Sequence, residues 1–246
     1  MGSLLTVRDL KVNFFTYYGV VNAVNGVSFT TEDEEILGIV GESGSGKSVT
    51  AQTIMGLIQP PGYVVGGEIN YHGSNLLELS EEEWGKLRGN EITMCFQNPG
   101  NALNPVLTIG EQLIRVYRRH TKKATKKEAE RRSVELLAEV NIPDAQKLLE
   151  RYPHQLSGGM CQRVMIVMSL ICEPNLLLLD EPTTGLDVTV QKQLLQVLRS
   201  LRQKTDASQL MITHDLGVIA NICDRVVVMY GGRVMEVARV DTILGA

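Results

Sequence analysis

Short runs of β-branched residues and leucine recur along the chain of 246 residues, and polar positions fall mainly between them. Each run has the length of a strand, and its continuous apolar character is typical of strands that are buried on both faces of a sheet. The predicted strands comprise residues 4–7, 36–40, 92–96, 176–179, 210–212 and 226–229. Longer stretches of helical character follow several of them, for instance residues 48–58 and 190–203. This alternation predicts a parallel sheet covered by helices, and therefore the α/β fold class.

The pattern changes over residues 108–155, where strand signals vanish and leucine and valine are spaced among many charges. We predict that this segment is a helical insert. Within it, residues 115–132 carry nine lysine and arginine residues but a single aromatic residue, Tyr117. The charges are spaced around a helix, so we interpret the run as a solvated helical surface and expect no nucleic-acid partner. A patch for nucleic acid or lipid headgroups is the less favoured alternative.

The composition excludes several classes of protein. The chain has 24 lysine and arginine residues against 28 aspartate and glutamate residues, and 43% of its residues are hydrophobic. These values exclude a collagen-like, coiled-coil or disordered protein. No apolar run approaches the roughly 20 residues that cross a bilayer, and the first residues lack the pattern of a secretory signal, so we expect a cytoplasmic location. The cysteines lack CxxC spacing and are expected to be reduced thiols; they are Cys95, Cys161, Cys172 and Cys223.

The segment GESGSGKS, residues 41–48, matches the pattern GxxxxGK[ST] and lies between a predicted strand and a predicted helix. Its three glycines are expected to adopt backbone dihedrals closed to other residues, so that successive N–H groups surround phosphate oxygens. Lys47 is expected to meet the terminal phosphates, and the Ser48 hydroxyl to bind Mg2+. The nucleotide-binding residues predicted here are Gly41, Glu42, Ser43, Gly44, Ser45, Gly46, Lys47 and Ser48. The loop predicts binding of a nucleoside triphosphate but names no reaction.

Further chemistry is predicted where other apolar strands end. Four leucines run directly into Asp180 and Glu181, so we expect Asp180 to hold the Mg2+ shell and Glu181 to orient or deprotonate the attacking water. His214 follows another strand and is expected to contact the γ-phosphate or position the water, although a lone histidine is more often structural. Gln97 is similarly placed to sense Mg2+ and the water. Hydrolysis is therefore favoured over phosphate transfer.

Residues 156–163 read LSGGMCQR, and here the chain resembles the nucleotide-binding subunits of ABC transporters, whose signature is LSGGQ or a close variant. The resemblance covers nearly the whole chain, with a Q-loop at Gln97, a Walker B strand ending at Asp180, a D-loop at 185–187 and a switch histidine at His214. It implies a single nucleotide-binding domain with a RecA-like P-loop core, an antiparallel β subdomain and an α-helical subdomain. The core and β subdomain are expected over about 1–107 and 164–246, and the helical subdomain over about 108–163.

The resemblance also implies partners and cofactors. Two subunits, identical or related, are expected to pack head to tail with ATP and Mg2+, so that the signature of one closes over the ATP held by the other. The signature residues expected to do this are Ser157, Gly158, Gly159 and Met160. Two membrane permease subunits and, indirectly, an extracytoplasmic solute-binding protein complete the assembly. The chain is then peripheral on the inner face of the cell membrane.

Within the family, three segments are similar to the ATPases that energise import of oligopeptides, dipeptides or nickel. They are FQNPGNALNP at 96–105, SGGMCQRVMI at 157–166 and DEPTTGLDVTVQ at 180–191. The chain departs from this subfamily at Cys161, where arginine is usual, and at Glu34-Glu35, where Gly-Glu is usual. The position of Cys161 in the signature suggests that a thiol reagent blocks hydrolysis, and an inert buried thiol is the alternative. Peptide and nickel cargo are not distinguished by the sequence.

The adenine-stacking aromatic is assigned to Phe14 by counting from the first strand, while Phe15, Tyr17 and Tyr18 serve equally well. Packing of these rings within the β subdomain is the structural alternative. Two other functions share the phosphate motifs. A soluble non-transport ABC ATPase acting on DNA or ribosomes is disfavoured by the net charge of −4 and the single cassette. A small-molecule kinase is disfavoured because it leaves the LSGGM segment unexplained.

Overall fold

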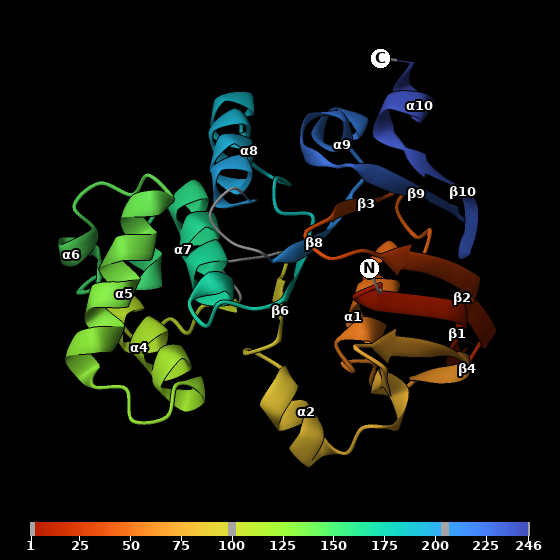
Figure 1. The fold of residues 1–246 in the computed structure, drawn as a ribbon, viewed down its shortest axis with the longest axis horizontal. Coiled ribbons are helices and arrows are strands. Elements are labelled where there is room, and N and C mark those ends of the chain that lie inside the picture. The colour runs from red at the N-terminus through yellow and green to blue at the C-terminus, as the bar shows by residue number, and fades with distance from the viewer. Residues whose placement is uncertain (1–2, 98–101, 203–206, 246) are drawn as a thin grey trace. The chain divides into compact units, whose positions relative to one another are not determined.

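The computed structural model describes residues 3–97, 102–202 and 207–245. The chain forms two units, one made of Met1–Gly85 with Ala207–Ala246 and the other of Lys86–Asp206. The first unit contains an antiparallel sheet and a set of mainly parallel strands (Figure 1). The second contains a parallel strand pair and most of the helices. The predicted α/β class is therefore confirmed.

The antiparallel sheet has the strand order β2-β1-β4-β5. Its members are β1 (Leu5–Thr16), β2 (Gly19–Thr31), β4 (Gly62–Tyr71) and β5 (Ser74–Asn75). The predicted strand at residues 4–7 is only the beginning of β1. It was expected to be short because the later residues of β1 alternate between buried positions such as Leu10 and Val12 and more exposed ones, which leaves no continuous apolar run.

The parallel strands of the first unit are β3 (Ile36–Val40), β8 (Ser208–Thr213) and β9 (Arg225–Tyr230). β3 pairs in parallel with both β8 and β9, and β10 (Arg233–Arg239) runs antiparallel to β9. Every residue of β3 and β8 is buried, as the continuous apolar runs predict. Helices α1 (Lys47–Ile54), α9 (Leu216–Ile222) and α10 (Val240–Leu244) belong to this unit. The predicted helix at 48–58 was too long, because the chain turns at Gly56, where φ is +62°.

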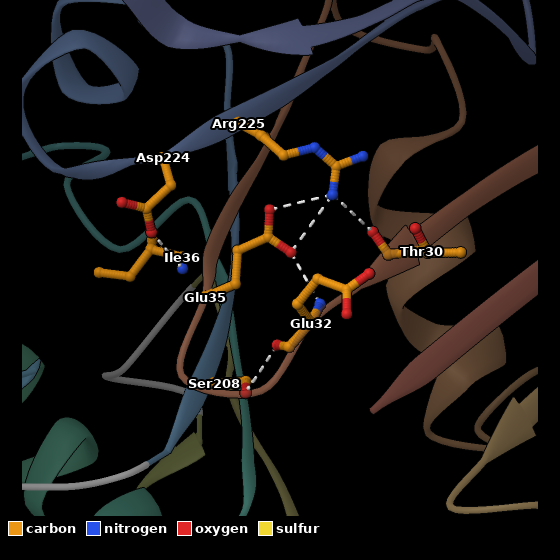
Figure 2. Close-up of polar contacts among 7 residues, drawn as sticks. All are labelled: Thr30, Glu32, Glu35, Ile36, Ser208, Asp224 and Arg225. Carbon is orange, nitrogen blue, oxygen red and sulfur yellow. Dashed lines mark hydrogen bonds and ion pairs between the residues drawn. The ribbon is translucent and has the colours of Figure 1, made fainter. Parts of the chain in front are cut away.

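An ion pair fixes the chain where it enters β3 (Figure 2). The Glu35 side chain is only 7% exposed and lies 3.1 Å from the Arg225 guanidinium at the start of β9. The same guanidinium donates to the Thr30 carbonyl, and the second oxygen of Glu35 accepts from the Glu32 N–H at 2.8 Å. These bonds satisfy the buried carboxylate and connect the end of β2 to β9.

The turn beside this ion pair is held by two more side chains (Figure 2). Ser208 Oγ donates to the Glu32 carbonyl at 3.1 Å. The same hydroxyl accepts from the Glu34 N–H at 2.9 Å. Asp224 accepts from the Ile36 N–H at 2.9 Å. The turn includes a residue in the left-handed region, Glu34, with φ of +59°. Glycine is the residue that adopts this conformation without strain.

The second unit contains the parallel pair β6 (Ile92–Cys95) and β7 (Leu176–Asp180). Its long helices are α4 (Ile109–His120), α5 (Lys126–Glu139), α7 (Gly158–Leu170) and α8 (Val188–Arg202), and a short α6 (Ala145–Leu148) follows α5. The one-turn helices η1 (Leu76–Glu78) and η2 (Pro153–Gln155) and the helix α2 (Glu81–Leu87) complete the described elements. Residues 108–155 are all described and contain no strand, as predicted. The subdomain boundaries remain a prediction. The predicted helix 190–203 corresponds to α8, and residue 203 lies outside the described residues.

Helices α4 and α5 both begin with a capping box. Thr108 and Thr125 accept from the N–H of Glu111 and Glu128, whose carboxylates bond back to the threonine N–H groups and hydroxyls. These hydrogen bonds hold the pKa of both glutamates below the ordinary value. The basic run lies on α4, the connecting loop and α5, with helical ion pairs such as Lys126–Glu130. This arrangement is that of a solvated helical surface.

Candidate active site

The phosphate loop lies between β3 and α1 in the first unit, as the sequence predicts. Gly46 caps α1 in the left-handed conformation, with φ of +96°, and Lys47 is the first residue of the helix. Gly44 has φ of +78°, and a Cβ atom at this position would meet nothing within 4 Å. The backbone around Gly44 is therefore open, and it lies just before a helix N-terminus that favours anions.

The sequence predicts that Gly41 is glycine because its backbone dihedrals are closed to other residues, and this reason is wrong. Gly41 is not among the residues with positive φ, so it does not supply an unusual dihedral. A Cβ at Gly41 would instead collide with the carbonyl oxygen of Met229 at the end of β9. Gly46 has both reasons, because its Cβ would also lie 2.5 Å from the carbonyl oxygen of Ala23 in β2.

Lys47 is folded over the loop. Its ammonium donates to the carbonyl oxygens of Gly41 and Glu42, both at 2.7 Å, and lies 3.4 Å from Ser45 Oγ. The residue is only 4% exposed, whereas Glu42, Ser43 and Gly44 are exposed. A buried cation is thus held against a loop whose outer side is accessible to an anion. Ser48 follows Lys47 and is half-buried.

His214 leaves the same sheet edge as the phosphate loop. β3 and β8 are parallel neighbours, and Val40 pairs with Thr213. The next residues, Gly41 and His214, therefore begin their loops side by side at the carboxyl ends of two strands, where ligands of open α/β sheets gather. Asp215 then caps α9 by accepting from the Gly217 N–H at 2.7 Å. This agrees with the predicted placement of His214.

The second unit brings the predicted glutamine and glutamate together. Cys95 of β6 pairs with Leu179 of β7, and the two chains continue to Gln97 and Glu181. Gln97 Nε2 donates to Glu181 Oε2 at 3.0 Å. Asp180, the last residue of β7, is 4% exposed. The two strand ends thus gather the amide and both carboxylates at one edge.

Sequence reasoning missed Thr184. Its hydroxyl donates to Glu181 Oε2 at 2.7 Å, so the same oxygen accepts from two side chains. Glu181 has φ of +47°, which is a strained conformation for a residue other than glycine. In the same turn, the Thr184 N–H donates to the Glu181 carbonyl. A threonine three residues after an acid in a turn is the signal that would have found this contact.

A buried thiol lies behind the strand end. Burial, and next the negative charge of Asp180, raise the pKa of Cys95 to about 12. Gln162 of α7 lies 3.5 Å from its sulfur and connects the signature helix to β6. Cys95 is therefore a neutral packing residue rather than a nucleophile.

The signature segment forms the start of α7, as the sequence predicts. Ser157 caps the helix by accepting from the Met160 N–H at 3.4 Å, and helical residues begin at Gly158. Ser157 and Gly158 are exposed, whereas a Cβ at Gly159 would lie 2.8 Å from Val190 in α8. The exposed start of this helix, which has 13 residues, carries main-chain N–H groups suited to an anion.

Cys161, which lies within the signature segment at 156–163, is 5% exposed, and its sulfur lies 3.7 Å from the Pro153 carbonyl. Burial raises the pKa of this thiol. Both observations favour the inert buried thiol over a reactive one. All four cysteines are free, as predicted.

The aromatic candidates for adenine stacking all contact other groups of the antiparallel sheet or its hairpin. The Phe14 ring packs on Gly62, where a Cβ would lie 2.7 Å from Phe14 Cε1. Phe15 meets Tyr63 edge to face. Tyr17 and Tyr18 contact each other and are the most exposed, at 98% and 96%. The assignment of Phe14 remains a prediction, with the others open.

Oxygen donors dominate the predicted metal site. Ser48, Gln97 and Asp180 offer a hydroxyl, an amide and a carboxylate, the hard donors that Mg2+ prefers. Among the described residues, no group of three or more histidine, cysteine, aspartate or glutamate side chains forms a metal cage. In the segment at 96–105, residues 98–101 lie outside the described residues.

The chain is similar in sequence to proteins of known family. The sequence profile of the ABC transporter family matches residues 24–184. The chain is 52% identical over 241 residues to the oligopeptide transport ATP-binding protein OppD of Bacillus subtilis, covering 98% of this chain and 67% of that protein. It is 50% identical over 238 residues to the dipeptide transport ATP-binding protein DppD of the same organism, covering 96% and 71%.

Solved structures give the same fold. The dimeric structure of the ATP-binding cassette MJ0796 in a post-hydrolysis state bound to ADP and Pi has a TM-score of 0.86 and 25% identity, covering 96% of this chain and 98% of that chain. The cbiO1 protein of Clostridium perfringens, part of the ABC transporter complex cbiONQ, has a TM-score of 0.83 and 26% identity, covering 100% and 92%. Among the described residues, no helix has the length and apolar character needed to cross a membrane.

Proposed function

This chain belongs to the ABC transporter family, and on that premise we propose that it is the ATP-binding and ATP-hydrolysing subunit of an importer of oligopeptides or dipeptides. The observation that carries the proposal is the sequence identity with peptide-transport ATP-binding proteins, which is about 50% over nearly the whole chain. The names of these relatives favour peptides over nickel as cargo. They give no support to a role on DNA or ribosomes.

The first unit supplies residues for binding the triphosphate. The loop at 41–48 surrounds the phosphates with N–H groups, and Lys47 places its ammonium against them. His214 contacts the γ-phosphate. Phe14, with Phe15, Tyr17 and Tyr18 as alternatives, stacks on the adenine. The open backbone at Gly44 and the buried position of the Lys47 ammonium support the roles of the loop and of Lys47.

The second unit supplies the residues for hydrolysis. Glu181 orients the attacking water and accepts its proton as the oxygen attacks the γ-phosphorus, the bond to the bridging oxygen breaks, and ADP leaves with the electron pair. The hydrogen bonds from Gln97 and Thr184 fix the orientation of the carboxylate. Ser48, Gln97 and Asp180 would hold Mg2+, which when bound neutralises charge on the phosphate oxygens.

The assembly is also part of the proposal. Ser157, Gly158, Gly159 and Met160 close over ATP held by a second cassette, identical or related, and the dimeric state of the solved MJ0796 cassette supports this. Two permease subunits and a solute-binding protein complete the importer, which places this chain on the cytoplasmic face of the membrane. Within the chain, about 108–163 forms the helical subdomain and the remainder the core with its β subdomain.

The test reconstitutes the chain with its permease subunits in proteoliposomes and measures phosphate release and peptide uptake. Replacing Glu181 by Gln should preserve ATP binding, trap a dimer and lower turnover by about 10²- to 10⁴-fold, because the proton acceptor is lost. Full turnover in this variant would refute the role of Glu181. Wild-type vesicles that hydrolyse ATP but accumulate nickel instead of a peptide would refute the cargo.

A further inference from the structure

The turn between β9 and β10 contacts the phosphate loop from outside it. Gly231 and Gly232 form this turn, with φ of +54° and +77°. Gly231 is exposed and Gly232 is buried. Neither residue has a role in the proposed chemistry, and both lie far along the chain from the phosphate loop.

Three backbone segments meet at Gly232. Its N–H donates to the Ser45 carbonyl of the phosphate loop at 3.1 Å, and its carbonyl accepts from the Asn25 N–H of β2 at 2.7 Å. The junction has little spare room. A Cβ at Gly232 would lie 2.9 Å from the Ala23 carbonyl oxygen, and a Cβ at Gly46 would lie 3.5 Å from the Cα of Gly232.

The bond to Ser45 fixes more than one carbonyl. The Ser45 carbonyl and the Gly46 N–H belong to one planar trans peptide, so they point in opposite directions. Holding the carbonyl toward the turn therefore directs the Gly46 N–H away from it. Gly46 caps α1, and its N–H is among those predicted to face the phosphates. The turn thus sets the direction of a donor that it does not contact.

We propose that the β9–β10 turn is a positioning element for the triphosphate, and that Gly232 is its positioning residue. The proposal rests on the proposed function as an ATP-binding subunit. Displacing the turn allows the Ser45–Gly46 peptide to rotate and weakens the hydrogen bond from the Gly46 N–H to phosphate, although the turn itself contacts no nucleotide. Gln97 and Glu181, the residues of the proposed hydrolytic step, belong to the other unit and are not part of the junction at Gly232, so we expect the larger effect on ATP binding.

The test compares Gly232→Ala with Gly231→Ala. Both substitutions place an L side chain at positive φ and share that backbone strain, but a Cβ at Gly231 would meet nothing within 4 Å. We expect Gly232→Ala to raise the Kd for ATPγS with Mg2+ about tenfold in calorimetry, and Gly231→Ala to change it less than about twofold. For ATP hydrolysis, KM should rise in Gly232→Ala while kcat stays within about twofold. Equal Kd values in the two variants would overturn the proposal.

A measurement on the wild-type chain decides the question if Gly232→Ala does not fold. Binding of ATPγS with Mg2+ should slow hydrogen exchange at the N–H groups of Gly232 and Asn25, because the ordered loop holds the turn closed. The N–H of His72, in the turn after β4, serves as the control. Unchanged exchange at Gly232 and Asn25 would overturn the proposal. Absence of ATPγS binding by the wild-type chain would instead refute the proposed function.

Discussion

Glu34 is held in a backbone conformation that suits glycine, and replacing it should stabilise the protein. Its φ is +59°, its side chain is exposed, and its N–H donates to Ser208 Oγ at 2.9 Å. Glycine keeps that N–H and removes the Cβ that opposes the left-handed conformation. The ion pair of Glu35 with Arg225 and the bond from Ile36 to Asp224 use other atoms, so they remain in Glu34→Gly.

Two opposing effects give the size of the change. A non-glycine residue in the left-handed region costs about 1–2 kcal/mol. Glycine also gives the unfolded chain more conformational freedom, which favours unfolding by about 0.4–1 kcal/mol and offsets part of this gain. We therefore expect a net gain of about 0.5–1 kcal/mol in the free energy of unfolding of Glu34→Gly, which corresponds to a rise of about 1–4 °C in Tm for a chain of this size.

Urea denaturation followed by circular dichroism measures the change, with two control variants. Glu34→Ala removes the same charge but keeps the Cβ, so it should not reproduce the gain. Asp33→Gly places glycine at an exposed neighbour without positive φ and should lower stability by about 0.4–1 kcal/mol. An equal gain in Glu34→Ala would show that charge is the cause and would refute the backbone argument.

Two further predictions concern the second unit. Thr184→Val should lower the kcat of ATP hydrolysis about tenfold with KM nearly unchanged, because Glu181 loses a hydrogen bond that orients it. Thr184→Ser keeps the hydroxyl and should have the kcat of the wild-type chain. Equal kcat values for all three proteins in a steady-state assay would contradict this prediction. Burial raises the pKa of Cys172 to about 11, so its thiolate fraction at pH 8 is about 0.1%, and iodoacetamide labelling followed by mass spectrometry should accelerate about tenfold per pH unit from 8 to 10. A rate that levels off near pH 9 would show an ordinary thiol.

The sequence predicted the strands that are buried on both faces, but of the more exposed strands it predicted only the beginning of β1 and missed others. β3, β7 and β8 are continuous apolar runs, and the structure places them within two residues of the prediction. β2 and β10 were missed because exposed residues interrupt them, and no residue of β10 is buried. Tertiary pairing, rather than a local apolar run, makes these segments strands.

The site shows a similar division. Lys47, Glu181 and Gln97 were predicted because each follows an apolar strand within a short pattern of residues. Thr184 was missed because its hydrogen bond with Glu181 depends on the conformation of a turn. The contact of Gly232 with Ser45 was not predicted, because it joins segments nearly 190 residues apart and exists only after folding.

Pattern searches treat the glycines of GESGSGKS as evidence for a ligand, yet two of them are required by neighbouring strands of the protein itself. Gly41 accommodates the end of β9, and Gly46 accommodates β2. A chain with the same eight letters but without such neighbours would have no steric need for glycine at those places. The glycines of the motif therefore reflect the packing of neighbouring strands as well as ligand binding, and the motif should be most diagnostic where those strands can also be recognised.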